Sequence, residues 1–91
     1  MSKKSYQVII SGIVQGVAFR FSAVRKAKQL GVNGWIKNRI DGKVETRVEG
    51  EENTVNLTVS WLKKGPIQSK VADIDVNELN YKGEFNSFEI R

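Results

Sequence analysis

The chain has 91 residues, of which 40% are hydrophobic, and it carries a formal net charge of +5. This length allows one compact domain with a hydrophobic core, so we expect a single domain over residues 1–91, with residues 1–4 as a flexible tail. The chain has no cysteine and no histidine. It therefore cannot form a disulfide, a thiolate metal site, a cysteine nucleophile or a phosphohistidine, and it lacks the side chain most often used for proton transfer near neutral pH.

The amino-terminal segment carries no targeting or membrane signal. After Met1-Ser2-Lys3-Lys4 the only apolar run is short, Val8 to Ile10, which is too short for a signal peptide or a membrane span. We therefore expect a cytoplasmic protein that does not contact membranes. The positive net charge favours anionic partners without identifying them.

The first half of the chain predicts a strand, a loop and a helix. Alternating apolar residues from Tyr6 indicate a strand that runs to about Gly12. The helix follows the loop, and Gly31 is placed to end it. Its apolar face is predicted from helical spacing to comprise Phe21, Val24, Ala27 and Leu30. The basic residues Arg25, Lys26 and Lys28 fit the solvated face of this helix better than a nucleic-acid site, so we do not expect a nucleic-acid partner.

The second half predicts a hairpin, a second helix and two further strands. Gly34 to Asn38 and Lys43 to Glu49 form the hairpin around an Asp41-Gly42 turn, and Gly50 ends it. Asn53 or Thr54 can cap a helix that Gly65-Pro66 closes. The remaining strands are expected over Val71 to Leu79 and Phe85 to Ile90.

This order of elements predicts the fold class. A β-α-β-β-α-β chain with a short extra C-terminal strand folds as an α+β, ferredoxin-like sandwich, with two helices on one face of a mainly antiparallel sheet. In that topology the first two strands run parallel with the third strand between them. Their carboxyl ends therefore lie at the same edge, two strand spacings or about 10 Å apart.

The loop Gly12 to Arg20, which reads G-I-V-Q-G-V-A-F-R, has the features of an anion site. Glycine allows backbone N–H groups to turn toward one point, successive N–H groups bind anions, and the helix that follows adds its positive end. Arg20 supplies a planar charged group that matches phosphate. The topology brings Asn38, at the end of the second strand, to the same edge. The sequence therefore predicts a site for a small phosphorylated ligand.

The chain resembles the acylphosphatases. The matching residues form a specific pattern of a phosphate loop followed by a Gly-Trp-x-x-Asn segment: Gly12, Val14, Gln15, Gly16, Val17, Phe19, Arg20, Leu30, Gly31, Gly34, Trp35, Asn38, Asp41, Gly42, Val44, Glu45 and Gly50. The element order and length match over essentially the whole chain. Ala18 and Ile13 stand at positions where relatives vary.

The resemblance implies hydrolysis of the carboxyl-phosphate bond in small acyl phosphates, by direct attack of water, without a metal, a cofactor or a phosphoenzyme. It places the family's catalytic positions on Arg20, which binds phosphoryl oxygens, and Asn38, which orients the water. The backbone of Gln15, Gly16, Val17, Ala18 and Phe19 completes the phosphate cradle. Inorganic phosphate is then both product and competitive inhibitor, and a monomer is expected.

Other functions are weighed against the same residues. Nucleotide-hydrolysing loops end in Gly-Lys-Ser/Thr, whereas this loop ends Phe19-Arg20-Phe21, and cysteine phosphatases need a thiolate that this chain lacks. Another alternative is a part of a larger carbamoyl-transfer protein, because acylphosphatase-like domains also occur in such proteins. A further alternative is a non-catalytic ferredoxin-like module that binds phosphate or RNA, although Lys43 to Glu49 offers no aromatic residue for base stacking. Trp35 and Phe19 are expected to pack in or near the core.

Overall fold

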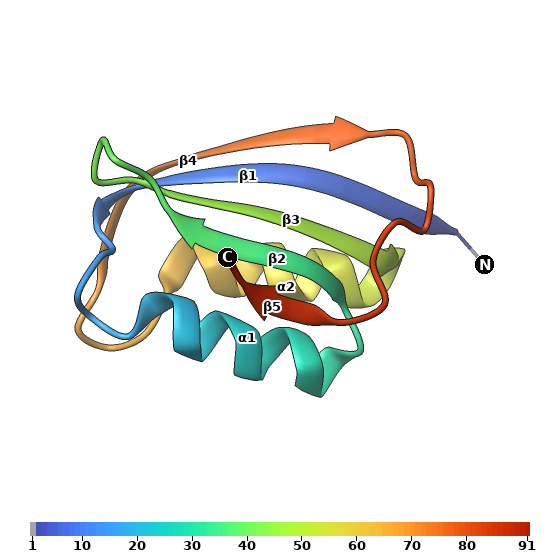
Figure 1. Ribbon diagram of the computed structural model, residues 1–91, viewed down its shortest axis with the longest axis horizontal. Coiled ribbons are helices and arrows are strands. Elements are labelled where there is room, and N and C mark those ends of the chain that lie inside the picture. Colours follow the sequence, from blue (N-terminus) through green and yellow to red (C-terminus); the bar gives the residue numbers. More distant parts are fainter. Residues whose placement is uncertain (1) are drawn as a thin grey trace.

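The computed structural model describes residues 2–91. Its elements, in chain order, are β1 (Lys3–Ile13), α1 (Phe19–Leu30), β2 (Asn33–Asn38), β3 (Val44–Glu51), α2 (Glu52–Lys64), β4 (Lys70–Leu79) and β5 (Phe88–Ile90). Figure 1 shows the strands as one layer with both helices packed beneath it.

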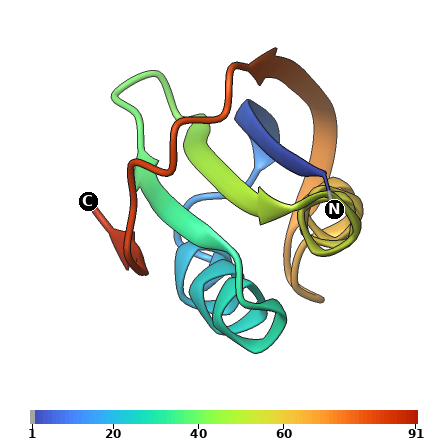
Figure 2. The same ribbon diagram turned by 90° about the vertical axis from the view of Figure 1, so that its right-hand side faces the viewer.

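The strands form one sheet in the order β4-β1-β3-β2-β5. β1 pairs antiparallel with β3 and β4, and β2 pairs antiparallel with β3, whereas β5 joins the edge of β2 in parallel. As a result β1 and β2 run in the same direction on either side of β3. Viewed from the end, α1 and α2 lie on the same face of the curved sheet (Figure 2). These features confirm the predicted ferredoxin-like α+β fold with a short extra strand.

The core lies between the sheet and the two helices. Its buried apolar residues come from both layers: Val8, Ile10, Val14, Phe19, Ala23, Ala27, Val32, Ile36, Val44, Val48, Val55, Val59, Leu62 and Phe88. Burial of each large apolar side chain contributes about 1.5 to 3 kcal/mol. Phe19 is only 1% exposed, and its ring centre lies 5.7 Å from that of Trp61 on α2. Phe19 therefore anchors the end of the β1–α1 loop to the core, as predicted.

The buried face of α1 differs from the predicted one. The helix begins at Phe19 and buries Phe19, Ala23 and Ala27, which are spaced by four residues. Phe21 follows Phe19 by two positions, or about 200° around the helix. It is therefore 60% exposed, and the prediction that Phe21 packs in the core is wrong. Val24 and Leu30 pack against the edge of the core.

The connection between β4 and β5 crosses the sheet face opposite the helices (Figure 2). The Glu49 carboxylate on β3 accepts hydrogen bonds from the N–H groups of Glu84, at 3.3 Å, and Phe85, at 3.1 Å. Glu49 is consequently 2% exposed.

Trp35 lies outside the core, contrary to expectation. Its half-buried side chain packs against two cations, with the Lys37 ammonium 5.5 Å and the Arg91 guanidinium 5.4 Å from the centre of its ring system.

Several predicted boundaries also need correction. A flexible tail was predicted over residues 1–4, but Lys3 and Lys4 belong to β1, where they pair with Glu51 and Gly50. Met1 lies outside the described residues. The strand β3 does not end at Gly50, because this pairing continues to Glu51 and α2 starts directly after it.

The start of α2 and the last strand differ as well. Neither Asn53 nor Thr54 caps α2. Glu51 occupies the cap position without a side-chain hydrogen bond, and the Thr54 hydroxyl inside the helix donates to the Glu51 carbonyl at 3.1 Å. β5 is limited to residues 88–90, since Phe85 is held by Glu49 instead of a strand partner.

Candidate active site

The loop between β1 and α1 turns sharply at two positions. Gly16 and Ala18 both have positive φ, 75° and 59°, and Ala18 is the N-cap of α1 without a side-chain cap. Glycine adopts this conformation freely, but for alanine it costs free energy, of order 1 kcal/mol or more. Strain of this kind is typical of backbone that is held in place for function.

The backbone N–H groups of this loop are available to a ligand. Within residues 2–91, none of the N–H groups of residues 15–19 donates a hydrogen bond. The first N–H groups of α1 have no acceptor within the helix, and the positive end of the helix dipole adds to their field. A run of unpaired N–H groups at a helix N-terminus suits a phosphoryl group.

Arg20 lies in the first turn of α1 beside this loop. Within residues 2–91 its half-buried guanidinium forms no ion pair or hydrogen bond with another side chain. A hollow of about 140 Å³ brings Arg20 together with Gly16, Ala18 and Phe19, and it is also lined by Val14, Phe21 and Ile90. The structure therefore assembles four of the seven predicted site residues around one depression.

Asn38 ends β2 at the same edge of the sheet. Val44 on β3 pairs with Ile10 of β1 on one side and with Asn38 on the other, so the predicted separation of two strands holds. Asn38 does not line the hollow itself. Its Oδ1 atom is buried and has no hydrogen-bond partner within residues 2–91. A buried acceptor without a donor costs about 1 to 3 kcal/mol, so this atom is suited to accept a hydrogen bond from a water or a ligand. Ser5 Oγ and Arg47 Nε, away from this edge, are also buried without a partner within residues 2–91.

The side chain of Gln15 links the β1–α1 loop to the hairpin that follows Asn38. Its Nε2 group donates to the carbonyls of Arg39 at 2.8 Å and Lys43 at 2.9 Å. Figure 1 shows the loop after β1 and the β2–β3 hairpin at the same end of the molecule. Sequence reasoning assigned only the backbone of Gln15, because no pattern in the sequence shows which carbonyls a glutamine side chain will reach.

The hairpin is stabilised by its own charges. The Lys43 N–H donates to Asp41 Oδ1 at 3.1 Å, and the Arg39 guanidinium lies 3.0 Å from Asp41 Oδ2. The hydrogen bond from Lys43 N–H, followed by the hydrogen bond and charge of Arg39, holds the pKa of Asp41 below its ordinary value. This arrangement explains Asp41-Gly42 as the turn that the sequence predicted.

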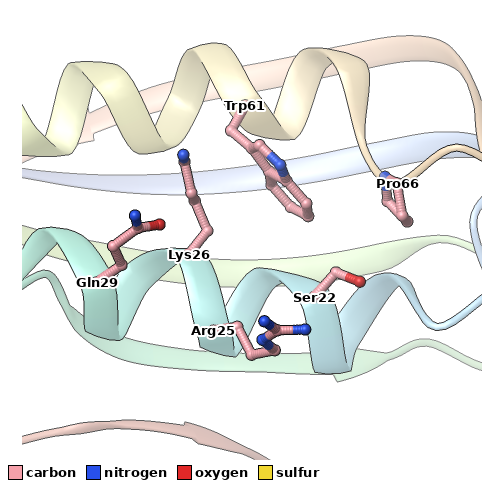
Figure 3. Close-up of a pocket in the computed structure, with 6 residues that line it drawn as sticks. All are labelled: Ser22, Arg25, Lys26, Gln29, Trp61 and Pro66. Carbon is pink, nitrogen blue, oxygen red and sulfur yellow. The ribbon is translucent and has the colours of Figure 1, made fainter.

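A larger hollow of about 530 Å³ lies between the two helices and contains none of the predicted site residues. Figure 3 shows Trp61 of α2 and Lys26 of α1 reaching across the gap, with Ser22, Arg25, Gln29 and Pro66 around it. It offers no unpaired backbone N–H groups of the kind found at residues 15–19, so size alone does not mark the reactive site. Arg25 and Lys28 are exposed, as predicted for the solvated face of α1, whereas Lys26, predicted on the same face, is half-buried.

Two general features of the described residues bear on function. Within residues 2–91, no three acidic residues lie close enough together to hold a metal ion. No helix in this part of the chain is both long and apolar enough to cross a membrane.

Comparisons with known proteins agree with the geometry. Residues 6–90 match the family described as Acylphosphatase. The acylphosphatase of Methylococcus capsulatus is 41% identical over 87 residues, which cover 96% of this chain and 95% of that protein. The crystal structure of acylphosphatase from Bacillus subtilis superposes with a TM-score of 0.92 at 40% identity, covering 97% of this chain and 98% of the other. The chain therefore belongs to the acylphosphatase family.

Proposed function

We propose that Arg20, the N–H groups of residues 15–19 and the Asn38 amide carry out the acylphosphatase reaction in this chain. The protein is an acylphosphatase, which cleaves acyl phosphates to a carboxylate and inorganic phosphate. The assignment of roles to residues is the proposal. The observation that carries it is the run of unpaired N–H groups beside a guanidinium that has no partner within residues 2–91.

The phosphoryl group is held by charge and by hydrogen bonds. Arg20 contacts two phosphoryl oxygens through its planar fork, and the loop N–H groups contact the oxygens from the backbone side. Phosphoryl transfer has a loose transition state, so positioning and charge stabilisation supply most of the catalysis. Donors that are already aimed at the oxygens need no reorganisation during the reaction.

Water then attacks phosphorus opposite the leaving group. The Asn38 amide orients this water, a new P–O bond forms, and the bond to the acyl oxygen breaks with its electron pair remaining on the carboxylate. The protons of the water pass to solvent and to the product phosphate. Because the conjugate acid of a carboxylate has a pKa of about 4 to 5, the leaving group needs no proton. The absence of histidine is therefore compatible with turnover.

The experiment for this proposal compares leaving groups. We expect phosphate release from benzoyl phosphate and almost none from an alkyl phosphate monoester, because an alkoxide needs a general acid to depart. Similar rates on the two classes would contradict the mechanism. Metal independence stays a prediction: EDTA should leave the rate unchanged, and loss of activity that Mg²⁺ restores would contradict it.

Three further expectations follow from the same proposal. Inorganic phosphate should compete with substrate for the cradle, so that it raises the apparent KM and leaves kcat unchanged. Inhibition that lowers kcat alone would place the anion elsewhere. We also infer a monomeric enzyme in the cytoplasm. Sedimentation equilibrium and cell fractionation would test these two inferences.

A further inference from the structure

We propose that Phe21 and Ile90 form a binding surface for the acyl group, and that this enzyme prefers acyl phosphates whose acyl part is small, apolar and uncharged. This inference rests on the proposed function, because it takes the hollow beside Arg20 as the place where the phosphoryl group binds. It concerns recognition of the acyl group, the part of the substrate that the phosphate cradle does not contact.

Both side chains are large, apolar and accessible. Phe21 is 60% exposed and Ile90 is 46% exposed, yet both line the same hollow as Arg20. Single exposed apolar residues are common on protein surfaces, but two of them on the wall of one hollow next to an anion site form a continuous apolar surface. Buried Val14 completes that surface.

Other contacts hold the two side chains in place. The Arg25 guanidinium, one helical turn beyond Phe21, lies 6.0 Å from the centre of the Phe21 ring and packs over it. Ile90 pairs with Ile36 across the parallel β2–β5 ladder, and the next N–H along the chain, that of Arg91, donates to the Ile36 carbonyl at 2.8 Å. The surface therefore belongs to a helix and a strand, which position side chains more precisely than a loop does.

The charges around the hollow determine which acyl groups fit. Arg20 is the only charged residue in its lining, and the phosphoryl group uses that charge. A carboxylate on the acyl part would find no second cation in the lining, and the nearby Arg25 guanidinium is already packed over the Phe21 ring. An ammonium group would find no acidic partner in the lining and would meet the charge of Arg20. An apolar group has no hydrogen bonds to water to lose when it binds here. The whole hollow is only about 140 Å³ and must also take the phosphoryl group, so the acyl group must be small.

The experiment measures kcat/KM for benzoyl, acetyl and succinyl phosphate, with each value divided by the rate of spontaneous hydrolysis. We expect the order benzoyl, acetyl, succinyl, the last carrying a second carboxylate. Phe21→Ala and Ile90→Ala should each reduce the ratio of benzoyl to acetyl kcat/KM about tenfold, the effect of removing apolar contacts in a specificity pocket. The comparison between variant and wild type cancels the intrinsic reactivity of each substrate.

Leu57→Ala is the matched control. Leu57 is 55% exposed on α2 and lines none of the hollows described above, so this variant should keep the wild-type ratio. An unchanged ratio in both test variants, or an equal loss on benzoyl and acetyl phosphate, would overturn the proposal. Failure of the proposed function looks different, because wild-type protein would then release no phosphate from acetyl phosphate. Circular dichroism checks the fold, and Phe21→Leu provides a milder variant at the helical position.

Discussion

Arg20 is the residue on which phosphoryl recognition depends most in the proposed mechanism. It supplies the only charge in the lining of the hollow, and the neighbouring N–H groups come from a strained backbone turn at Ala18, where φ is 59°. In the proposed mechanism the guanidinium and the backbone therefore contact the same anion from two sides. Because no other described side chain neutralises Arg20, its full charge is available to the ligand.

Replacement of Arg20 by lysine should separate charge from geometry. Arg20→Lys keeps the positive charge but loses the planar fork that binds two oxygens, so we expect kcat/KM to fall by the equivalent of about 2 to 4 kcal/mol. Steady-state kinetics with benzoyl phosphate measures the loss. Lys28→Arg, the reverse exchange at an exposed lysine on the same helix, should have little effect. Wild-type activity of Arg20→Lys would mean that guanidinium geometry is not used.

Gln15 offers a second test at the scale of one residue, because its amide donates to two hairpin carbonyls. In Gln15→Glu the ionised carboxylate cannot donate and repels both oxygens. We expect weaker turnover at neutral pH, by the equivalent of about 1 to 3 kcal/mol. Lower pH protonates the new carboxyl group and restores one donor. The activity of Gln15→Glu relative to wild type should therefore rise as pH falls.

The control for this pH dependence is Gln68→Glu, which introduces the same charge at an exposed position in the connection between α2 and β4. Its activity relative to wild type should not change with pH. A flat relative profile for Gln15→Glu would show that the two hydrogen bonds do not position the hairpin for catalysis.

At the scale of elements, the site is made where secondary structures begin and end. The proposed phosphate cradle joins the end of β1 to the start of α1, and Asn38 is the last residue of β2 before the hairpin. Rigid strands and a helix fix the ends, while the short segments between them carry the reactive groups. The β2–β3 hairpin is the least buried of these parts, with exposed residues at positions 40–43.

The hairpin should lose stability in acid. Folding lowers the pKa of Asp41 below its ordinary value of 3.8, because Lys43 N–H and Arg39 favour the charged form. The charged carboxylate therefore stabilises the fold above about pH 4, and this contribution disappears as pH falls through the folded pKa. Urea unfolding should show Asp41→Asn less stable than wild type at pH 7, with the difference becoming smaller as the pH falls below about 4.

Asp75→Asn is a suitable comparison for that experiment. Asp75 is exposed on β4 and forms no ion pair or side-chain hydrogen bond within residues 2–91. If the two variants lost equal stability at pH 7 and followed the same pH dependence, the contacts of Asp41 would not contribute to the hairpin.

At the scale of the whole molecule, the topology was predictable because it depends on strong local signals. Alternation in β1, the Asp41-Gly42 turn and the glycines after each helix indicate the order of elements, and the right order leaves few arrangements of the sheet. The positions of Arg20 and Asn38 follow from that order. The helical phase of Phe21 was not predictable from spacing alone, since it depends on α1 starting at Phe19.

Contacts between distant segments could not be predicted from the sequence, for a different reason. The Gln15 amide reaches carbonyls 24 and 28 residues away, and Ile90 reaches the hollow only because β5 adds to β2 in parallel. Backbone carbonyls are present at every residue, so no residue pattern identifies the partners. The same holds for Glu49, whose burial results from the connection that passes over it.

The central claim is that two segments share the reaction: the β1–α1 loop binds the anion, and Asn38 at the end of β2 orients the water. The most direct test measures phosphate affinity by calorimetric titration and kcat with benzoyl phosphate in wild type and Asn38→Ala. We expect kcat to fall at least about a hundredfold, as for other misplaced reacting groups, while phosphate affinity changes little. A fall in phosphate affinity as steep as the fall in kcat would contradict the account, because Asn38 would then belong to the binding site and not to the placement of water.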